Sequence, residues 1–418
     1  MDRLLVRPGN ALSGSVRVSG ATKNSGCKQM AAALMAPGRS RLSNMPPVAD
    51  LDVMSDVLRA VGATVEQPND DEVIVDASGD LHGEAPYDLV TKMRASVNVL
   101  GPLLARCGEA FVAMPGGDNI GSRKLDMHFR GLADLGADIE VVHGTIQARC
   151  TRLVGASLTL DFPSVGATEN LLTASVLADG HTRIENAARE PEITELAAFL
   201  NRMGAHITGA GTAVIDVEGV RELHAVDAEI MPDRIETGTF LMACAAAGGE
   251  ITLEGARLEH VEMVARKLGD MGVKVAGTPE GIWVSAVGRP RAVDISTLPH
   301  PGFATDFMPL AMAPLTVADG TSVVTENVFD NRYTFVDELN RMGADVRTEG
   351  RHAVVRGVEC LSGAPVRALD VRAGAALVLA GLAADGETLV SECRHIARGY
   401  VDLPGMLRSL GADVTIAD

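Results

Sequence analysis

The chain has 418 residues with a hydrophobic fraction of 46% and only 3% aromatic residues, which predicts aliphatic cores large enough for two domains. A formal net charge of −18 disfavours nucleic acid and anionic membrane surfaces as partners. No uncharged apolar stretch reaches the length of a membrane-spanning helix, and the six cysteines form neither a disulfide framework nor a metal-ligand spacing. We therefore expect a reduced, cytoplasmic protein without a metal or another cofactor.

The main pattern along the chain is the element L-x-x-[LMV]-G-[AV], which occurs six times. Its glycine stands at Gly62, Gly136, Gly204, Gly272, Gly343 and Gly411. The spacings of 74, 68, 68, 71 and 68 residues are too long for the common short solenoid repeats. Almost the whole chain is therefore expected to consist of six similar helix-and-sheet units.

The third unit shows the content of a repeat most clearly. Apolar residues recur at helical spacing from Ile193 to Met203, and Gly204 follows where a helix C-cap glycine is expected. The segments HIT and AVIDV then flank a Gly-Ala-Gly turn and predict a hairpin. A second glycine precedes each capped helix, at Gly38, Gly108, Gly180, Gly249, Gly320 and Gly386. Each unit is therefore predicted to run helix, strand, helix and hairpin.

The six units divide naturally into two α/β domains of three units each, with a crossover near residues 230–233. The opening residues from Leu4 to Val18 have strand character outside the first unit, so we expect them to complete the second domain. The predicted domains are residues 22–231, and residues 1–21 together with 232–418.

Basic residues in glycine- or turn-flanked segments suggest a pocket for multiply charged anions that draws on both halves of the chain. These residues are Lys23, Arg94, Arg123, Arg332, Arg372 and Arg398. Arginine forks match the geometry of carboxylate and phosphate groups. Any one of these residues alone is better explained as a solvated or salt-bridged surface cation. The chain has no Walker A or G-x-G-x-x-G signature, so neither a P-loop nor a Rossmann turn is expected to hold the anion.

Longer segments carry a family resemblance: GATKN, YDLVTKMRAS, PGGDNIGSR, SVGATEN, ENAAREPEI, PDRIETGTF, PHPGFATD, ENVFDNR and HIARGY. From about residue 5 to residue 415 the chain resembles the UDP-N-acetylglucosamine 1-carboxyvinyltransferases, or enolpyruvyl transferases. The resemblance implies two inverse α/β barrel-like domains of three repeats each, with the active site in the cleft between them. It also implies transfer of the enolpyruvyl group of phosphoenolpyruvate to the 3-hydroxyl of UDP-N-acetylglucosamine, by addition and elimination with release of phosphate. This reaction is the first committed step of peptidoglycan synthesis.

The resemblance also assigns site residues. Phosphoenolpyruvate-binding positions are matched by Lys23, Asn24, Arg123, Arg332, Arg372 and Arg398, of which Lys23 and Arg398 also match catalytic positions. Positions that bind UDP-N-acetylglucosamine are matched by Asn24, Arg94, Arg123, Lys124, Leu125, Asp126, Met127, Ser164, Val165, Gly166, Asp306 and Val328.

Asp306 matches the family carboxylate that orients or deprotonates the attacking hydroxyl. From the residues alone, an N-cap of the following segment FMPLAM is the simpler interpretation of this aspartate. His128 and His395 are expected to be structural, and we assign them no proton transfer.

Asp118 departs from the family pattern, because the family usually has cysteine at this position as general acid toward the methylene carbon of phosphoenolpyruvate. Aspartate can donate a proton, so the resemblance implies an active enzyme whose loop, from Pro115 to Arg123 in the first domain, closes as a lid. A carboxylate is a far poorer nucleophile than the thiolate that fosfomycin alkylates in typical family members. Fosfomycin resistance is therefore expected.

Two alternatives remain open. The sister enzyme 3-phosphoshikimate 1-carboxyvinyltransferase shares the fold and the chemistry, but motifs for a phosphorylated shikimate ring are not visible. A catalytically silent relative that binds UDP-sugars for regulation is the other alternative, and intact Lys23, Arg94, Asp306 and Arg398 argue against it. The sequence does not identify a regulatory protein partner.

Overall fold

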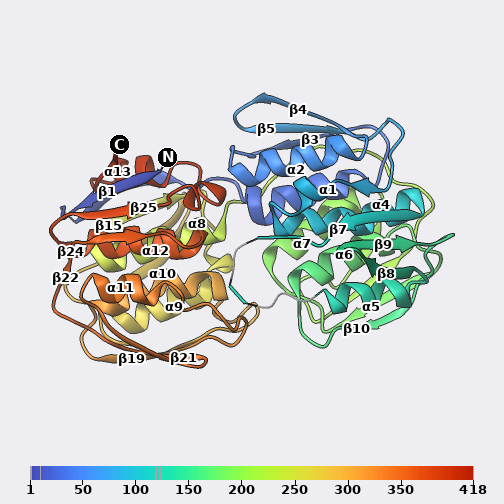
Figure 1. The fold of residues 1–418 in the computed structure, drawn as a ribbon. Helices are drawn as coiled ribbons and strands as arrows, with labels where there is room; N and C mark the ends of the chain where they lie inside the picture. Colours follow the sequence, from blue (N-terminus) through green and yellow to red (C-terminus); the bar gives the residue numbers. More distant parts are fainter. Residues whose placement is uncertain (1, 10, 118–119, 122–124, 418) are drawn as a thin grey trace. The chain divides into compact units, whose positions relative to one another are not determined.

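The computed structural model describes residues 2–9, 11–117, 120–121 and 125–417 (Figure 1). The predicted order of helix, strand, helix and hairpin is confirmed along the chain. The first repeat contains α1 (Cys27–Ala33), β3 (Arg39–Ser43), α2 (Ala49–Ala60), β4 (Thr64–Asn69) and β5 (Glu72–Asp76). The second contains α4 (Leu100–Cys107), β7 (Glu109–Ala113), α5 (Asp126–Asp134), β8 (Asp138–Val142) and β9 (Thr145–Arg149), with α3 (Tyr87–Val90) before it. The third contains α6 (Val165–Ser175), β11 (His181–Glu185), α7 (Pro191–Arg202), β12 (His206–Thr208) and β13 (Val214–Glu218).

The second half of the chain repeats this order. The fourth repeat contains α8 (Arg234–Ala247), β15 (Gly249–Glu254), α9 (Glu262–Met271), β16 (Lys274–Thr278) and β17 (Gly281–Ala286). The fifth contains α10 (Met308–Thr316), β19 (Thr321–Thr325), α11 (Val336–Arg341), β20 (Asp345–Glu349) and β21 (His352–Arg356). The sixth contains α12 (Val371–Leu382), β25 (Thr388–Ser391), α13 (Leu403–Ser409) and β26 (Asp413–Ala417). Its hairpin partner is the N-terminal strand β1 (Arg3–Arg7), which pairs antiparallel with β25 and β26.

Every repeat forms one four-stranded sheet in which a short parallel strand comes from another repeat. In the first half of the chain these strands are β6 (Glu84–Ala85), β10 (Ser157–Thr159) and β14 (Ala228–Glu229), which pair with β7, β11 and β3. In the second half they are β18 (Ile295–Ser296), β23 (Pro365–Arg367) and β2 (Leu12–Arg17), which pair with β19, β25 and β15. A small additional pair joins β22 (Leu361–Ser362) to β24 (Ala384–Asp385).

This strand exchange closes each set of three repeats into a ring. The short strand that follows the hairpin of one repeat joins the sheet of the next repeat. The strand β14, which follows the hairpin of the third repeat, joins the sheet of the first repeat. In the second half the ring is closed by β1 and β2, because the chain starts and ends in the same set of repeats. The chain therefore forms two compact units. Of the segments given below for each unit, only the residues that the structure describes are meant. One comprises Gly20–Asp118 and Arg123–Met231, and the other comprises Met1–Ser19, Asn119–Ser122 and Pro232–Asp418. We call them the α1–α7 unit and the α8–α13 unit.

The third repeat explains locally why the sequence adopts this order. α7 begins with Pro191, whose fixed φ suits a first helical turn, and ends at Arg202. Gly204 follows its C-cap with a φ of 107°. A side chain at Gly155 would also clash, because a Cβ there would lie 2.3 Å from the carbonyl oxygen of His181. That close approach is where the connecting chain enters the next sheet, so glycine is required at the crossover.

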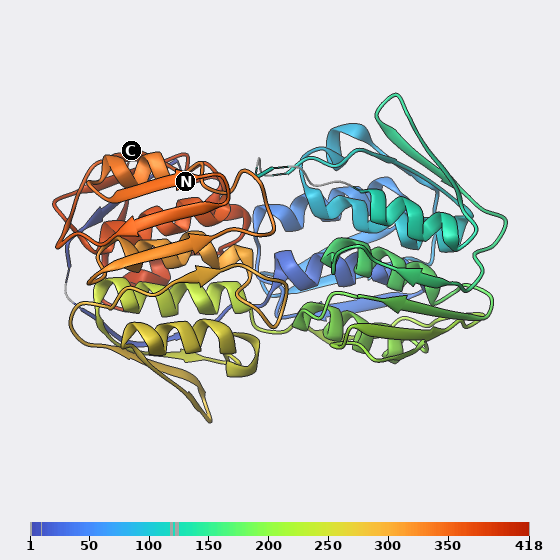
Figure 2. The same ribbon diagram turned by 90° about the horizontal axis from the view of Figure 1, so that it is seen from below.

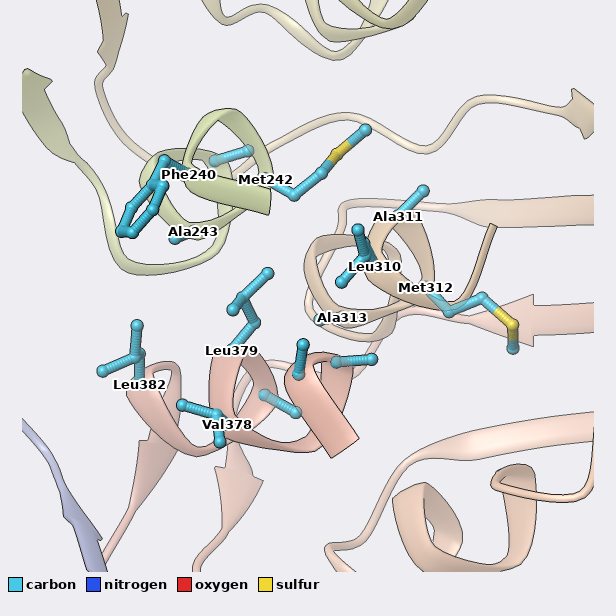
Figure 3. Packing of buried hydrophobic residues seen from close by; sticks show 14 of the residues in the cluster. Phe240, Met242, Ala243, Leu310, Ala311, Met312, Ala313, Val378, Leu379 and Leu382 are labelled. Carbon is cyan, nitrogen blue, oxygen red and sulfur yellow. The ribbon is translucent and has the colours of Figure 1, made fainter. Parts of the chain in front are cut away.

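The first helix of each repeat lies inside its unit, and the second helix lies nearer the surface. All nine residues of α10 and all twelve residues of α12 are buried. Figure 3 shows labelled side chains of α8, α10 and α12 gathered in one apolar region. Figure 2 shows the helices of the α8–α13 unit, coloured from yellow-green to red, in a view turned by 90°. The inner helices therefore provide a rigid support for the side chains at their ends.

Among the described residues, none of the helices is both long and apolar enough to cross a membrane.

Candidate functional site

Eight of the predicted site residues stand at one structural position, the start of the inner helix of a repeat. In the first repeat, Lys23 and Asn24 lie in a π-helical turn (Thr22–Gly26) directly before α1. In the second repeat, Arg94 begins a 3-10 helix (Arg94–Val99) directly before α4. Backbone amides at such helix starts have no acceptor within the helix, which favours anionic ligands.

The third repeat has the clearest helix N-terminus. Ser164 is the N-cap of α6 and accepts a hydrogen bond from the amide of Ala167 at 3.4 Å. Val165 and Gly166, the first two residues of α6, carry amides that the helix ladder does not use. This segment is suited to a phosphate group.

The fifth and sixth repeats place Asp306 and Arg372 at the same position. Asp306 lies in a 3-10 turn (Thr305–Phe307) that leads into α10, and Arg372 is the second residue of α12. The N-cap of α12 is Asp370, whose carboxylate accepts hydrogen bonds from the amides of Arg372 and Ala373 at 2.8 and 3.0 Å. Both side chains of interest are therefore fixed by the inner helices of the α8–α13 unit.

Asp306 forms ion pairs with two buried arginines, Arg332 and Arg372, an arrangement that we call the clasp. Arg332 Nη2 lies 3.0 Å from Asp306 Oδ1, and Arg372 Nε lies 3.3 Å from Asp306 Oδ2. Burial alone would raise the pKa of Asp306, but Arg372, Arg332 and Arg234 outweigh it and hold the pKa well below its usual range. The N-cap interpretation of Asp306 is wrong, because Phe307 is the N-cap of α10 and the Asp306 carboxylate is paired with the two arginines.

Arg372 combines this ion pair with unused donors. The residue is 3% exposed, and neither of its Nη atoms has a hydrogen-bond partner among the described residues. Its guanidinium carbon lies 5.4 Å from the centroid of the Tyr400 ring. Burial alone would lower the pKa of Arg372, but Tyr400, Asp306 and Asp233 raise it above its ordinary value, so the cation is permanent.

Glu326 connects Asp306 to another predicted segment. Its Oε2 accepts a hydrogen bond from Thr305 Oγ1 at 2.8 Å, and its Oε1 accepts one from the amide of Val328 at 2.7 Å. Glu326 is 1% exposed. The structure therefore brings Val328 and the segment of Asp306 together through a buried glutamate that the sequence analysis did not single out.

In the α1–α7 unit, the predicted cation Lys23 pairs with the buried carboxylate of Asp50. A second buried carboxylate, Glu169 on α6, accepts from Lys28 Nζ at 3.1 Å and from Asn98 Nδ2 at 2.7 Å. Burial raises the pKa of Glu169, and Lys28 partly offsets this effect. These contacts tie α1 and the segment that follows Arg94 to α6.

His128 lies on α5 at the predicted sugar-nucleotide segment and contacts Asn170 of α6. It is 4% exposed, and Asn170 Nδ2 lies 3.1 Å from its Nδ1, so the proton sits on Nε2. Burial and the charge of Arg94 lower its pKa to about 4 against the opposing effect of Asp126. His128 is therefore neutral at pH 7, consistent with the structural role expected for it. Of the other predicted residues in this segment, Leu125 is the N-cap of α5, and Asp126 and Met127 are the first two residues of α5.

Three of the predicted residues, Asp118, Arg123 and Lys124, lie outside the described residues, as does part of the predicted lid. Arg398 closes a short 3-10 helix (Ile396–Arg398) and is half-buried. Among the described residues, no group of histidine, cysteine or acidic side chains could hold a metal ion.

The fourth repeat adds residues that the sequence analysis missed. Asp233 caps α8, with Oδ1 accepting from the amides of Ile235 and Glu236 at 2.7 and 3.2 Å. Arg234 is 8% exposed and stacks on Phe307 at 5.9 Å from the ring centroid, beside Asp306. Burial raises the pKa of Glu236 to about 7, although its Oε1 accepts from the amide of Ser19 at 2.8 Å. The sixfold repeat was the available signal, because PDRIETGTF starts the inner helix of the fourth repeat.

These features define a class: a six-repeat α/β protein whose inner helices present charged side chains at their starts. Comparison with known proteins gives the family. Residues 6–407 match the family model described as EPSP synthase (3-phosphoshikimate 1-carboxyvinyltransferase), and the chain belongs to this family of carboxyvinyl transferases.

Individual relatives agree with this assignment. The chain is 51% identical over 413 residues to a UDP-N-acetylglucosamine 1-carboxyvinyltransferase of Corynebacterium jeikeium, covering 99% of this chain and 98% of the relative. It is 50% identical over 417 residues to UDP-N-acetylglucosamine 1-carboxyvinyltransferase 1 of Staphylococcus aureus, covering 99% of both chains.

Solved structures show the same fold. The enolpyruvyl transferase NikO of Streptomyces tendae is similar with a TM-score of 0.87 and 27% identity, covering 99% of this chain and 98% of that one. An EPSP synthase of Acinetobacter baumannii is similar with a TM-score of 0.78 over all of both chains, at 17% identity. The predicted enolpyruvyl transferase fold is confirmed.

Proposed function

We propose that this protein transfers the enolpyruvyl group of phosphoenolpyruvate to the 3-hydroxyl of UDP-N-acetylglucosamine and releases phosphate. The observation that carries the proposal is the Asp306 carboxylate, clasped by two buried arginines, in a chain 51% identical to a relative named for this reaction. Both substrates are multiply charged anions, so an acidic protein needs local cations to bind them.

The reaction requires proton movements at defined atoms. In the addition step, the 3-hydroxyl oxygen bonds to C2 of phosphoenolpyruvate, the hydroxyl loses its proton, and C3 gains one. In the elimination step, C3 loses a proton and the bond from C2 to the phosphate oxygen breaks. We assign Asp306 to orient the hydroxyl and accept its proton, and Asp118 to donate the proton that C3 gains.

The ion pairs of Asp306 suggest how its basicity is controlled. A carboxylate held by Arg332 and Arg372 is a weak base, because its pKa is low and both oxygens accept charge-assisted hydrogen bonds. A phosphoenolpyruvate oxyanion bound to the unused Nη donors of Arg372 would share the positive charge that now acts on Asp306 alone. Substrate binding would therefore loosen the clasp and make Asp306 more basic. In this assignment Arg332 and Arg372 act on phosphoenolpyruvate together with Lys23, Asn24, Arg123 and Arg398.

For the sugar nucleotide we propose the start of α6 as the phosphate-binding element. Ser164, Val165 and Gly166 offer a capped helix end with unused amides, which suits a diphosphate oxygen. The remaining proposed contacts to UDP-N-acetylglucosamine are Asn24, Arg94, Arg123, Lys124, Leu125, Asp126, Met127, Asp306 and Val328.

We further propose that the reaction supplies the first committed step of peptidoglycan synthesis, in the cytoplasm. All six cysteines are free, which is compatible with a reducing compartment. Because Asp118 replaces the usual cysteine, we propose resistance to fosfomycin.

Phosphate release tests the proposal. Purified protein is incubated with phosphoenolpyruvate and either UDP-N-acetylglucosamine or 3-phosphoshikimate, and phosphate is measured. We expect release with the first acceptor only. Release with 3-phosphoshikimate alone would support the sister reaction, which the family description names. No release with either acceptor, together with tight binding of UDP-N-acetylglucosamine, would support a silent UDP-sugar-binding relative.

A further inference from the structure

Tyr400 lies under the buried guanidinium of Arg372 in the α8–α13 unit. Tyr400 is 2% exposed, and its ring centroid is 5.4 Å from the guanidinium carbon. An aromatic face stabilises a buried cation without occupying its N–H donors, whereas a carboxylate in the same place would consume them. This difference explains how Arg372 can be stabilised while, within the part of the chain that the structure describes, both Nη atoms stay unpaired.

A hydroxyl pair anchors the Tyr400 ring to α8. Tyr400 Oη lies 2.7 Å from Thr239 Oγ1, and Thr239 Oγ1 donates to the carbonyl oxygen of Ile235 at 2.8 Å. Because the Thr239 proton is used in that bond, Tyr400 must be the donor to Thr239. Burial raises the pKa of the Tyr400 phenol, against the effect of Arg372, so this proton is retained at neutral pH.

Tyr400 also joins two predicted anion-binding segments. It follows Arg398 by two residues, and its amide donates to the carbonyl oxygen of Ile396 at 3.1 Å. The contact with Thr239 therefore anchors the segment of Arg398 to α8, while the ring supports Arg372 on α12.

We propose that Tyr400, anchored by Thr239, is a positioning residue that keeps the Arg372 guanidinium in place with its Nη donors available for a substrate oxyanion. The inference rests on the proposed function, because it assumes that Arg372 receives phosphoenolpyruvate. Tyr400 itself acts through Arg372 and makes no bond to the reacting atoms.

Steady-state kinetics of three variants test this role. Tyr400→Leu removes the ring, Tyr400→Phe removes only the hydroxyl, and Thr239→Val removes the anchor with little change in volume. We expect Tyr400→Leu to raise the KM for phosphoenolpyruvate by about 10-fold, the scale of a desolvated cation–π contact, with the KM for UDP-N-acetylglucosamine unchanged. Tyr400→Phe and Thr239→Val should each raise it by about 3-fold, the scale of one hydrogen bond.

The double variant separates positioning from general destabilisation. Tyr400→Phe combined with Thr239→Val should be no worse than either single variant, because both remove the same hydrogen bond. Thr316→Val is the matched control, since Thr316 is also a buried helix threonine, with Oγ1 donating to the Ala313 carbonyl at 2.6 Å. It should lower stability without changing either KM.

Equal rises of both KM values, or an unchanged KM for phosphoenolpyruvate in folded variants, would overturn the proposal. If Tyr400→Leu does not fold, Tyr400→Phe and Thr239→Val decide the question by the same criterion. Inactive wild-type protein would instead count against the proposed function, so the two failures are distinguishable.

Discussion

Replacing Arg332 by glutamine removes one of the two guanidinium groups that hold Asp306. Arg332 is buried, and its Nη2 lies 3.0 Å from Asp306 Oδ1. A charge-assisted hydrogen bond contributes about 1.5–3 kcal/mol. The Asp306 side chain is 33% exposed, so we take the lower end, and about 1.5 kcal/mol corresponds to a rise of about one unit in the pKa of Asp306.

The sign of the pH dependence follows from the lowered pKa of Asp306 in the folded protein. Stability from this ion pair is fully present above the unfolded pKa of about 3.9 and is lost as pH falls through the lower folded pKa. Arg332→Gln should therefore be less stable than wild type at pH 7. This deficit should shrink on acidification, because protonation of Asp306 abolishes the wild-type ion pair.

The assay is an NMR titration of protein with ¹³Cγ-labelled aspartate, with Asp306 assigned from Asp306→Asn, combined with chemical denaturation at several pH values. The matched control is Arg39→Gln, which breaks the surface pair of Arg39 and Glu66 at 2.9 Å, where the side chains are 54% and 48% exposed. This control should cost less than about 0.5 kcal/mol. An Asp306 pKa unchanged in Arg332→Gln would refute the clasp as the cause of the low pKa.

Three further predictions concern the same chain. Asp306→Asn should lower turnover by about 10²–10⁴-fold with little change in affinity for UDP-N-acetylglucosamine, which kinetics and calorimetry can measure; near-normal turnover would remove Asp306 from its assigned role. Glu236, with a pKa of about 7 in the folded protein, favours folding while protonated, so wild-type stability should fall from about pH 4.3 to pH 7. In denaturation experiments, Glu236→Gln should lose roughly 3 kcal/mol less of its free energy of unfolding than wild type between about pH 4 and pH 8. An identical pH dependence of the two proteins would contradict the assignment. Wild-type protein should resist fosfomycin, and Asp118→Cys should stay active and gain a covalent adduct visible by intact mass; an adduct on wild type would be inconsistent with this reading.

The repeat was predictable from the sequence because its signals are local. A glycine such as Gly204 is required wherever a helix ends in the left-handed region, and helical spacing from Ile193 to Met203 marks the face that is buried. The strand exchange was not predictable in the same way. β6 and β14 have only two residues each, too few for any periodic pattern, and their partners lie in other repeats.

The candidate site was only partly predictable. Asp306 and Arg372 were found through the family motifs, but no motif indicates that these residues form an ion pair. Glu326 and Tyr400 were missed because their roles depend on contacts between distant segments, such as the 2.7 Å contact of Tyr400 with Thr239. The roles of Asp118, Arg123 and Lys124 remain predictions from the sequence.

The most direct test of the proposed reaction is phosphate release from phosphoenolpyruvate in the presence of UDP-N-acetylglucosamine, with the product identified by mass spectrometry. We predict stoichiometric release of phosphate and a sugar nucleotide that gains the mass of one enolpyruvyl group. Release that requires 3-phosphoshikimate instead, or an unmodified sugar nucleotide after complete incubation, would contradict it.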